Sequence, residues 1–299
     1  MERPHTIHVP VMPREVIELL APAPGQTMLD ATAGGGGHTR LLAERVGGTG
    51  RVLAVDRDPS AIERMREAAD RPNVVPICAS YDELDELAVI PPEGLDGVLL
   101  DLGLSTDQLR DDARGFSYQS HGRLDMRFDP TRGRPAWQLL AELSQEELAN
   151  LIYAYGEERL SRRIARRIVE VRRRTPLRTA DQLAEVVRSC VPRSRGHRID
   201  PATRTFQALR IAVNQELDRL ERLLRRLPQW LKPGGRVVVI AFHSLEDRLV
   251  KRAFTDRDVW ERITKKPLRP SREEVAGNPK SRSARLRAAI RRPVAQQAG

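Results

Sequence analysis

Short apolar runs alternate with amphipathic stretches in the first hundred residues of the chain. Four of these runs predict strands of a parallel sheet, at Thr27–Ala31, at Arg51–Asp56, at Val74–Cys78 and within Leu95–Ser105, and the second of them has the pattern of a buried strand. Between the second and third runs, Ala61–Ala69 has the apolar spacing of a helix. This alternation of strand and helix predicts an α/β fold with a doubly wound, mostly parallel sheet.

The pattern changes after residue 106. About a hundred residues pass before the next strand, far more than one crossover helix needs, so an insertion is expected. Two capping boxes, which begin at Ser144 and Thr179, predict that the insertion is mostly helical. The chain is therefore divided into a sheet domain at 1–106 and 214–299 and an inserted, mostly helical substrate-recognition subdomain at 107–213.

The sheet pattern resumes near residue 231. A Leu-x-Pro-Gly-Gly sequence at Leu231–Gly235 precedes the β-branched run Val237–Ile240, which predicts a fifth strand. Two later runs, Trp260–Lys266 and Ala284–Arg291, predict the last two strands, joined by a basic, proline-containing loop.

Four consecutive glycines, Gly34–Gly37, follow the first predicted strand. Glycine lets the backbone adopt positive φ and approach a ligand closely. Asp56 ends the second strand twenty positions after Gly36, where a carboxylate can accept hydrogen bonds from ribose hydroxyls. Thr39 and Arg40 occupy the two positions where a dinucleotide fingerprint would need its third glycine, and no P-loop sequence occurs. The turn thus indicates a small cofactor and disfavours NAD, so an NAD-dependent oxidoreductase stays as a weaker interpretation and a ligand-free connector as a further alternative.

The remaining pattern, Asp30-x-Thr32-x-Gly34-x-Gly36, resembles motif I of class I S-adenosylmethionine (SAM) methyltransferases. Thr32 stands where that class usually has its first glycine. The Leu-x-Pro-Gly-Gly entry to the fifth strand is typical of the same class and supports it independently. The resemblance implies a Rossmann-like fold that binds SAM.

Cysteine content and hydropathy indicate the cellular compartment in which the protein works. Cys78 and Cys190 are far apart and have no C-x-x-C partner, which argues against a disulfide framework and against a thiolate metal site. No apolar stretch is long enough to span a membrane, and the N-terminus lacks the apolar region of a signal peptide. We expect a soluble, cytoplasmic protein with no membrane partner and no metal.

The formal net charge of +10 is unevenly distributed. Residues 1–106 carry 9 basic and 17 acidic side chains, whereas residues 107–213 carry 21 and 14, and residues 248–299 carry 15 and 5. This segregation predicts that a polyanion such as RNA contacts the insertion and the C-terminal segment. Within the insertion, Leu160–Arg174 has one apolar face and arginines on the others, which fits either RNA contact or a solvated helix face.

Further candidate residues follow the ends of the strands. Asp101 ends the fourth strand, which places it near Asp30 and Asp56 at the edge where ligands bind in such folds, although it could instead cap a helix. Tyr81 follows the third strand, where an aromatic ring could lie on the adenine of SAM or simply pack under the next helix. His243 follows the fifth strand and is a candidate for substrate contact or for a satisfied core histidine.

Over nearly its full length the chain resembles the MraW (RsmH) family, bacterial methyltransferases that act on the N4 amine of a cytidine in 16S ribosomal RNA. Eight stretches carry the resemblance: His8-x-Pro10-Val11, Gly34–His38, Asp101–Ser105, Arg114–Ser117, Leu124–Arg127, Thr205–Ile211, Phe242–Arg248 and Asn278–Ala284. By matching position the resemblance implies a set of SAM-binding residues: Gly36, Gly37, His38, Asp56, Tyr81, Asp101 and Gln108. It also implies a substrate cytidine in the decoding region of the small ribosomal subunit, and we expect a monomer or a homodimer.

Asp101 is also the candidate catalytic residue, because a group that accepts a proton from the weakly nucleophilic N4 amine would assist methyl transfer. Other amino methyltransferases have an Asp/Asn-Pro-Pro-aromatic tetrad here, whereas this chain has Asp101-Leu102-Gly103-Leu104. The absent prolines leave open whether Asp101 serves the amine, the methionine end of SAM, or both. An enzyme acting on another nucleic acid and a noncatalytic RNA-binding assembly factor remain the alternative functions.

Overall fold

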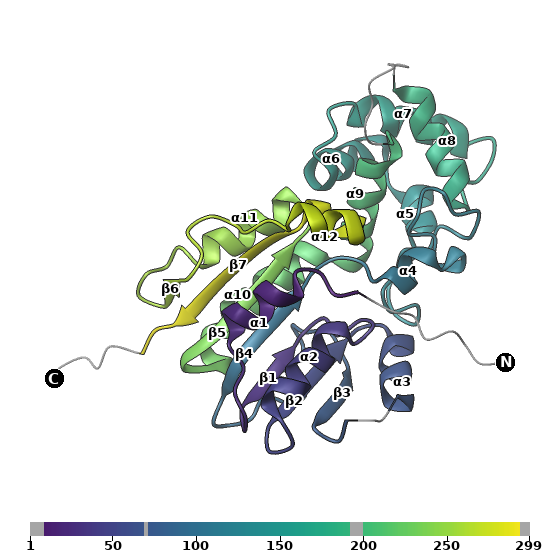
Figure 1. The fold of residues 1–299 in the computed structure, drawn as a ribbon. Helices are drawn as coiled ribbons and strands as arrows, with labels where there is room; N and C mark the ends of the chain where they lie inside the picture. Colours follow the sequence, from purple (N-terminus) through teal and green to yellow (C-terminus); the bar gives the residue numbers. More distant parts are fainter. Residues whose placement is uncertain (1–8, 69–70, 192–199, 294–299) are drawn as a thin grey trace. The chain divides into compact units, whose positions relative to one another are not determined.

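The computed structural model describes residues 9–68, 71–191 and 200–293 (Figure 1). His8 and Ala69, which belong to the sequence-based predictions, lie outside these residues. Two compact units are present. Unit 1 consists of Met1–Gly103 and Leu217–Gly299, and unit 2 is Leu104–Glu216.

A sheet forms the centre of unit 1 (Figure 1). In the described part of the chain it has seven strands in the order β3-β2-β1-β4-β5-β7-β6. Strands β3, β2, β1, β4 and β5 are parallel, and β7 runs antiparallel to both β5 and β6. The strand bounds are β1 (Thr27–Asp30), β2 (Arg51–Asp56), β3 (Val74–Cys78), β4 (Leu95–Asp101), β5 (Leu231–Ala241), β6 (Trp260–Arg262) and β7 (Arg285–Arg291). The predicted doubly wound, mostly parallel α/β fold is confirmed.

Alternate residues of the central strands face opposite sides of the sheet, and both sides are covered by helices. In β4, Val98 and Leu100 pack into the core that contains the apolar face of α10, while Leu99 packs into the core that contains α1 and α2; all three are fully buried. Burial on both faces explains why the strands have continuous apolar sequences. The helices of this unit are α1 (Pro13–Leu20), α2 (Gly37–Val46), α3 (Pro59–Glu67), α10, which begins at the last residue of unit 2 (Glu216–Trp230), α11 (Ser244–Ala253), α12 (Arg272–Gly277) and the 3-10 helix η2 (Pro279–Ser283).

Strand order reverses between β1 and β4. Both strands run parallel, so their carboxyl ends, at Asp30 and Asp101, lie at the same edge of the sheet. In doubly wound folds the ligand lies outside the carboxyl ends of the strands at such a switch point. The fold therefore positions the glycine turn that follows β1 where a cofactor is expected.

The C-terminal hairpin differs from its prediction in two details: the connection predicted as a loop contains α12 and η2, and the first of the two strands is shorter than expected. Strand β6 ends at Arg262 rather than continuing to Lys266. The N–H groups of Ile263 and Thr264 both donate to the carbonyl of Ala288, at 3.0 and 3.2 Å, so two residues oppose one and the regular ladder stops.

Helices dominate unit 2, as the sequence predicts. They are α4 (Thr106–Arg110), the 3-10 helix η1 (Asp112–Arg114), α5 (Ala136–Glu142), α6 (Gln145–Gly156), α7 (Ser161–Arg172), α8 (Ala180–Cys190) and α9 (Ala202–Asn214). The capping boxes predicted at Ser144 and Thr179 are both present, at the starts of α6 and α8. A separate hydrophobic core, which includes Leu148, Ile164 and Leu183, holds these helices together.

In the described part of the chain, none of the helices combines the length and the apolar character that crossing a membrane requires.

Candidate functional site

The glycine-rich turn between β1 and α2 has the geometry that its sequence predicts. Gly34 and Gly36 adopt φ of 50° and 76°, the left-handed region that favours glycine. The N–H of Gly36 donates to the carbonyl of Ala33 at 2.7 Å and closes the turn, and α2 begins at Gly37. The helix N-terminus and its free N–H groups thus follow directly after a backbone stretch that a ligand can approach.

Asp30 stabilises this turn through two hydrogen bonds. It is fully buried, and its two oxygens accept hydrogen bonds from the Thr39 hydroxyl at 2.7 Å and from the Thr32 N–H at 3.2 Å. Burial raises the pKa of its carboxyl despite these hydrogen bonds. Asp30 therefore connects the end of β1 to the first turn of α2, and its role is structural.

Asp56 connects the end of β2 to the same turn. One carboxylate oxygen accepts from the Gly34 N–H at 2.7 Å and the other from the Asp58 N–H at 2.8 Å. Burial raises the pKa of Asp56 to about 6, although the two backbone hydrogen bonds oppose this shift. Each carboxylate oxygen can accept a further hydrogen bond, so Asp56 can bind hydroxyl groups of a ligand seated against Gly34–Gly37.

His38 and Asp101 meet at the switch point. His38 lies in the first turn of α2 and Asp101 ends β4; their Nε2 and Oδ2 atoms are 3.5 Å apart, and the imidazole is 5% exposed. Burial favours the neutral imidazole, but the nearby carboxylates of Asp101 and Asp30 raise the pKa of His38 above its ordinary value. The contact with Asp101 is an ion-pair contact, since neither ring nitrogen of His38 has a hydrogen-bond partner among the described residues. The other carboxylate oxygen, Oδ1 of Asp101, is buried and has no hydrogen-bond partner among the described residues.

Thr32 holds the backbone of Asp101. Its hydroxyl oxygen accepts the N–H of Asp101 at 2.6 Å and so joins the turn after β1 to the last residue of β4. The sequence showed Thr32 only as a departure from the glycine usual in motif I. Threonine carries a side-chain hydroxyl that glycine lacks. This difference was the one local signal in the sequence that position 32 makes a polar contact.

Tyr81 belongs to the loop that follows β3. Its ring is partly buried against the core that contains α10, so packing accounts for part of its surface. The next residue, Asp82, has a carboxylate that is only 3% exposed and is bound by Arg219 and Arg222 of α10. Sequence reasoning did not find this ion-pair cluster.

Gln108 lies in unit 2. It forms a capping box with Ser105, in which the Ser105 hydroxyl accepts the Gln108 N–H and the Gln108 side chain accepts the Ser105 N–H, each at 3.1 Å. The side chain is 8% exposed. The other six predicted SAM-binding residues, Gly36, Gly37, His38, Asp56, Tyr81 and Asp101, belong to unit 1. The assignment of all seven residues to SAM binding stays a prediction.

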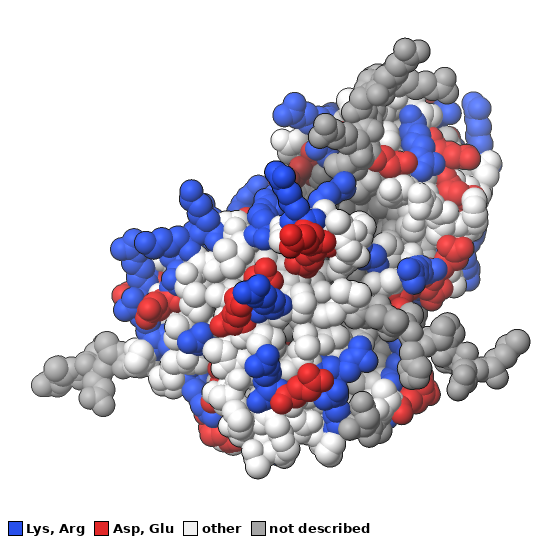
Figure 2. Space-filling view, viewed as in Figure 1, with Lys and Arg blue, Asp and Glu red and all other residues white. Residues whose placement is uncertain are grey.

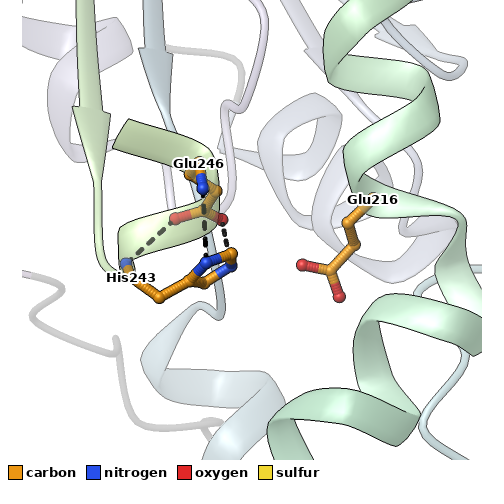
Figure 3. Close-up of side chains that lie close together, drawn as sticks. All are labelled: Glu216, His243 and Glu246. Carbon is orange, nitrogen blue, oxygen red and sulfur yellow. Dashed lines mark hydrogen bonds and ion pairs between the residues drawn. The ribbon is translucent and has the colours of Figure 1, made fainter. Parts of the chain in front are cut away.

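His243 caps a helix. Its Nδ1 accepts the N–H of Glu246 at 3.4 Å, and its Nε2 lies 3.1 Å from Glu246 Oε1 within the first turn of α11 (Figure 3). The other Glu246 oxygen accepts the N–H groups of Phe242 and His243. Figure 3 also labels Glu216, whose two oxygens accept from the Arg210 guanidinium at 2.8 Å each. Contacts within the described residues thus pair the carboxylates of Glu216 and Glu246. The Nε2 atom of His243 is buried and has no hydrogen-bond partner among the described residues, so substrate contact and a core role both stay predictions for this histidine.

Basic side chains gather on one part of unit 1. In Figure 2 they lie over the region that Figure 1 labels α11 and β6. Among residues 248–293, the exposed basic residues are Arg248, Lys251, Arg252, Arg257, Arg262, Lys265, Lys266, Arg269, Arg272, Lys280, Arg282 and Arg292. Arg285 and Arg287 do not belong with them: Arg287 is 7% exposed with its Nε 2.6 Å from Asp247, and Arg285 lies 3.6 Å from the same carboxylate.

The predicted basic helix of the insertion is α7. Ile164, Ala165 and Ile168 are buried on one side, and Arg162, Arg166 and the following Arg173 are exposed. Arg167 pairs with Glu170 on the same helix. The exposed arginines are thus placed for contact with either solvent or a polyanion.

The chain matches the MraW methylase family over residues 5–292. A protein named Ribosomal RNA small subunit methyltransferase H from Rhodopirellula baltica is 50% identical over 298 residues, which cover 96% of this chain and 92% of that protein. A protein of the same name from Thermomicrobium roseum is 48% identical over 310 residues and covers 96% and 94%. A crystal structure of a putative methyltransferase from Streptococcus mutans in complex with SAH is 11% identical, with a TM-score of 0.46, and covers 97% of this chain and 99% of that chain.

Proposed function

Because the chain belongs to the MraW methylase family, we propose that it transfers a methyl group from SAM to the N4 amine of a cytidine in 16S ribosomal RNA. The target cytidine lies in the decoding region of the small ribosomal subunit. Relatives that are named ribosomal RNA small subunit methyltransferase H and cover at least 95% of this chain support an activity on ribosomal RNA.

One observation supports the cofactor most strongly. The Oδ1 atom of Asp101 is a buried carboxylate oxygen that has no hydrogen-bond partner within residues 9–68, 71–191 and 200–293, and it lies beside a glycine turn at the strand-order switch point. An unpaired buried acceptor of this kind is costly, and the ammonium group at the methionine end of SAM would satisfy it. Asp56 at the end of β2 suits the ribose hydroxyls of the same molecule, so the donor and acceptor set fits SAM.

Bound SAM would supply an electrophilic methyl group on a sulfonium, so the chain needs no covalent nucleophile. Gly34–Gly37 let the cofactor lie against the backbone, and Asp56 fixes its ribose, which orients the reacting groups in line. His38 lies against Oδ2 of Asp101, and the other oxygen, Oδ1, is free of hydrogen bonds from the described residues. That free oxygen either holds the cofactor's ammonium group or accepts the proton that the N4 amine loses as the new bond forms.

The two roles of Asp101 predict different kinetics. If Asp101 binds the ammonium group, Asp101→Asn raises the dissociation constant of SAM and leaves kcat at saturating SAM nearly unchanged. If it accepts the amine proton, the same variant keeps its SAM affinity and loses about two to four orders of magnitude in kcat. Measuring both quantities on one folded variant separates the roles.

The activity itself is tested with purified protein, SAM carrying a labelled methyl group, and small ribosomal subunits or free 16S RNA. Digestion to nucleosides followed by mass spectrometry should place the label on N4-methylcytidine. Label on carbon 5 of cytosine, on another base or in large-subunit RNA would contradict the proposed specificity. SAM binding without transfer to any RNA would favour the noncatalytic assembly factor.

A further inference from the structure

We propose that Arg219 and Arg222 of α10 are positioning residues for the adenosine half of SAM, and that they act through Asp82 on the loop that carries Tyr81. This inference rests on the proposed use of SAM. It adds two residues that lie about 140 positions from this loop in the sequence.

The contacts converge on one carboxylate. Asp82 Oδ1 accepts from Arg219 Nη1 at 2.8 Å and from the hydroxyl of Ser80, while Oδ2 accepts from Arg222 Nε and Nη2 at 2.9 and 2.7 Å. Arg219 Nη1 also lies 3.3 Å from Glu83 Oε1. Asp82 and Arg219 are 3% and 17% exposed as side chains, so water competes little for this pair.

The same loop has a second attachment to α10. The indole N–H of Trp230 donates to Asp85, and Arg226 Nε lies 3.3 Å from the other oxygen of that carboxylate. Between the two attachments, the apolar face of α10 packs into the core that includes Leu84 and that Tyr81 packs against. Helix α10 therefore fixes the loop through polar contacts at both ends and apolar packing between them.

The charge balance shows that the Asp82 contacts stabilise the ionised carboxylate. Burial tends to raise the pKa of Asp82, but the hydrogen bonds from Ser80, Arg219 and Arg222 outweigh burial and lower it. Losing one arginine leaves a buried carboxylate partly unpaired, which favours a shift of the loop toward water. Tyr81, adjacent to Asp82, moves with any such shift.

The test measures binding of S-adenosylhomocysteine by calorimetry, so it does not depend on which RNA is methylated. Arg219→Gln should weaken binding about tenfold, and Arg219→Lys should restore part of that loss because it keeps the charge without the planar fork. Arg225→Gln is the matched control: Arg225 is on the same helix, its side chain is 73% exposed, and its ion pair is with Glu221 one turn away. The control should bind as the wild type does.

A double-mutant cycle distinguishes positioning from general destabilisation. In a Tyr81→Ala background, Arg219→Gln should reduce the affinity for S-adenosylhomocysteine little further, because the aromatic ring that Arg219 positions is already absent. The milder Arg222→Gln, at a side chain that is 50% exposed, gives the same comparison if Arg219→Gln does not fold. With methylthioadenosine, which lacks the amino-acid end, the losses should be equal to those with S-adenosylhomocysteine.

Three outcomes would overturn the inference. They are wild-type affinity in folded Arg219→Gln and Arg222→Gln proteins, full additivity with Tyr81→Ala, and an equal loss in the Arg225→Gln control. The proposed function is tested by a different measurement. It requires methyl transfer to 16S RNA, whereas this inference requires only that the protein bind the adenosine moiety.

Discussion

The imidazole Nε2 of His38 lies 3.5 Å from the carboxylate Oδ2 of Asp101, and this pair joins the first turn of α2 to the end of β4. His38 lies on α2, which follows β1, and Asp101 is the last residue of β4. The strand order of the sheet reverses between β1 and β4. A protonated His38 places a positive charge beside one oxygen of this carboxylate, and the other oxygen has no hydrogen-bond partner in the part of the chain that the structure describes. The pair therefore helps to orient the carboxylate of Asp101.

Replacing His38 tests this pairing. Because the folded protein raises the pKa of His38 above 6.5, the ion pair contributes stability that is fully present below pH 6.5 and is lost as pH rises through the raised pKa. His38→Gln should lower the free energy of unfolding by about 1–3 kcal/mol at pH 6. Urea denaturation from pH 6 to pH 9 should show the difference between wild type and variant shrinking. A difference that stays constant with pH would indicate that His38 is neutral.

Asp56 is expected to make cofactor binding pH-dependent. Its pKa of about 6 means that the carboxyl gains a proton as pH falls from 7.5 to 5, and a protonated group is a weaker acceptor for ribose hydroxyls. SAM affinity should fall over this range, and Asp56→Asn should remove this component of the pH dependence while costing about 1–3 kcal/mol of binding at pH 7.5. Calorimetry at several pH values measures both effects. Equal slopes for the two proteins would assign the titration to another group.

Thr32→Val removes the acceptor for the Asp101 N–H while it keeps the β-branched shape. The lost hydrogen bond should lower the free energy of unfolding by about 1–3 kcal/mol and let the end of β4 shift, which reduces turnover. Thr32→Ser retains the hydroxyl and serves as the control, with stability and turnover close to those of wild type. If the Val and Ser variants behave alike, this hydrogen bond does not position Asp101.

The sequence predicted the sheet and the glycine turn because both leave local signals. Strands such as Arg51–Asp56 and Val74–Cys78 are confirmed residue for residue, because each is a short, mostly apolar run that ends at a polar loop. The four central residues of Arg51–Asp56 are buried, whereas Val74–Cys78 lies at the edge of the sheet and is only partly covered. Side-chain pairs between distant segments leave no such pattern. The contact of Thr32 with Asp101 spans 69 positions and that of Arg219 with Asp82 spans 137, so only the folded sheet brings these residues together.

Burial within the C-terminal segment changes how the basic residues are interpreted. Arg285 and Arg287 are two positions apart in β7, so their side chains lie on the same face of the sheet, where both are close to Asp247. They count in the net charge of the segment but are ion-paired within the protein. The exposed side chains Lys265, Lys266 and Arg282 are the better candidates for phosphate contact.

RNA affinity should depend on both basic surfaces. Charge reversal of Arg162, Arg166 and Arg173 in the insertion, or of Lys265, Lys266 and Arg282, should weaken binding to 16S RNA. Each lost phosphate contact should reduce the slope of log affinity against log salt by about 0.7–0.9. Affinity for S-adenosylhomocysteine, measured in parallel, should be unchanged.

Binding titrations at several salt concentrations check this prediction. If both triple variants keep the wild-type affinity and salt slope, the exposed arginines and lysines only interact with solvent, and RNA binds elsewhere. A loss in one variant alone would limit the RNA surface to that segment.

The central claim is that this chain methylates N4 of a cytidine in the decoding region of small-subunit RNA. The most direct measurement is mass spectrometry of nucleosides and fragments of 16S RNA from cells that lack this protein and from the same cells supplied with it. The account predicts that one N4-methylcytidine signal from the decoding region disappears without the protein and returns with the wild type, but not with a folded Asp56→Ala variant. An unchanged N4-methylcytidine signal in the cells that lack the protein would contradict it.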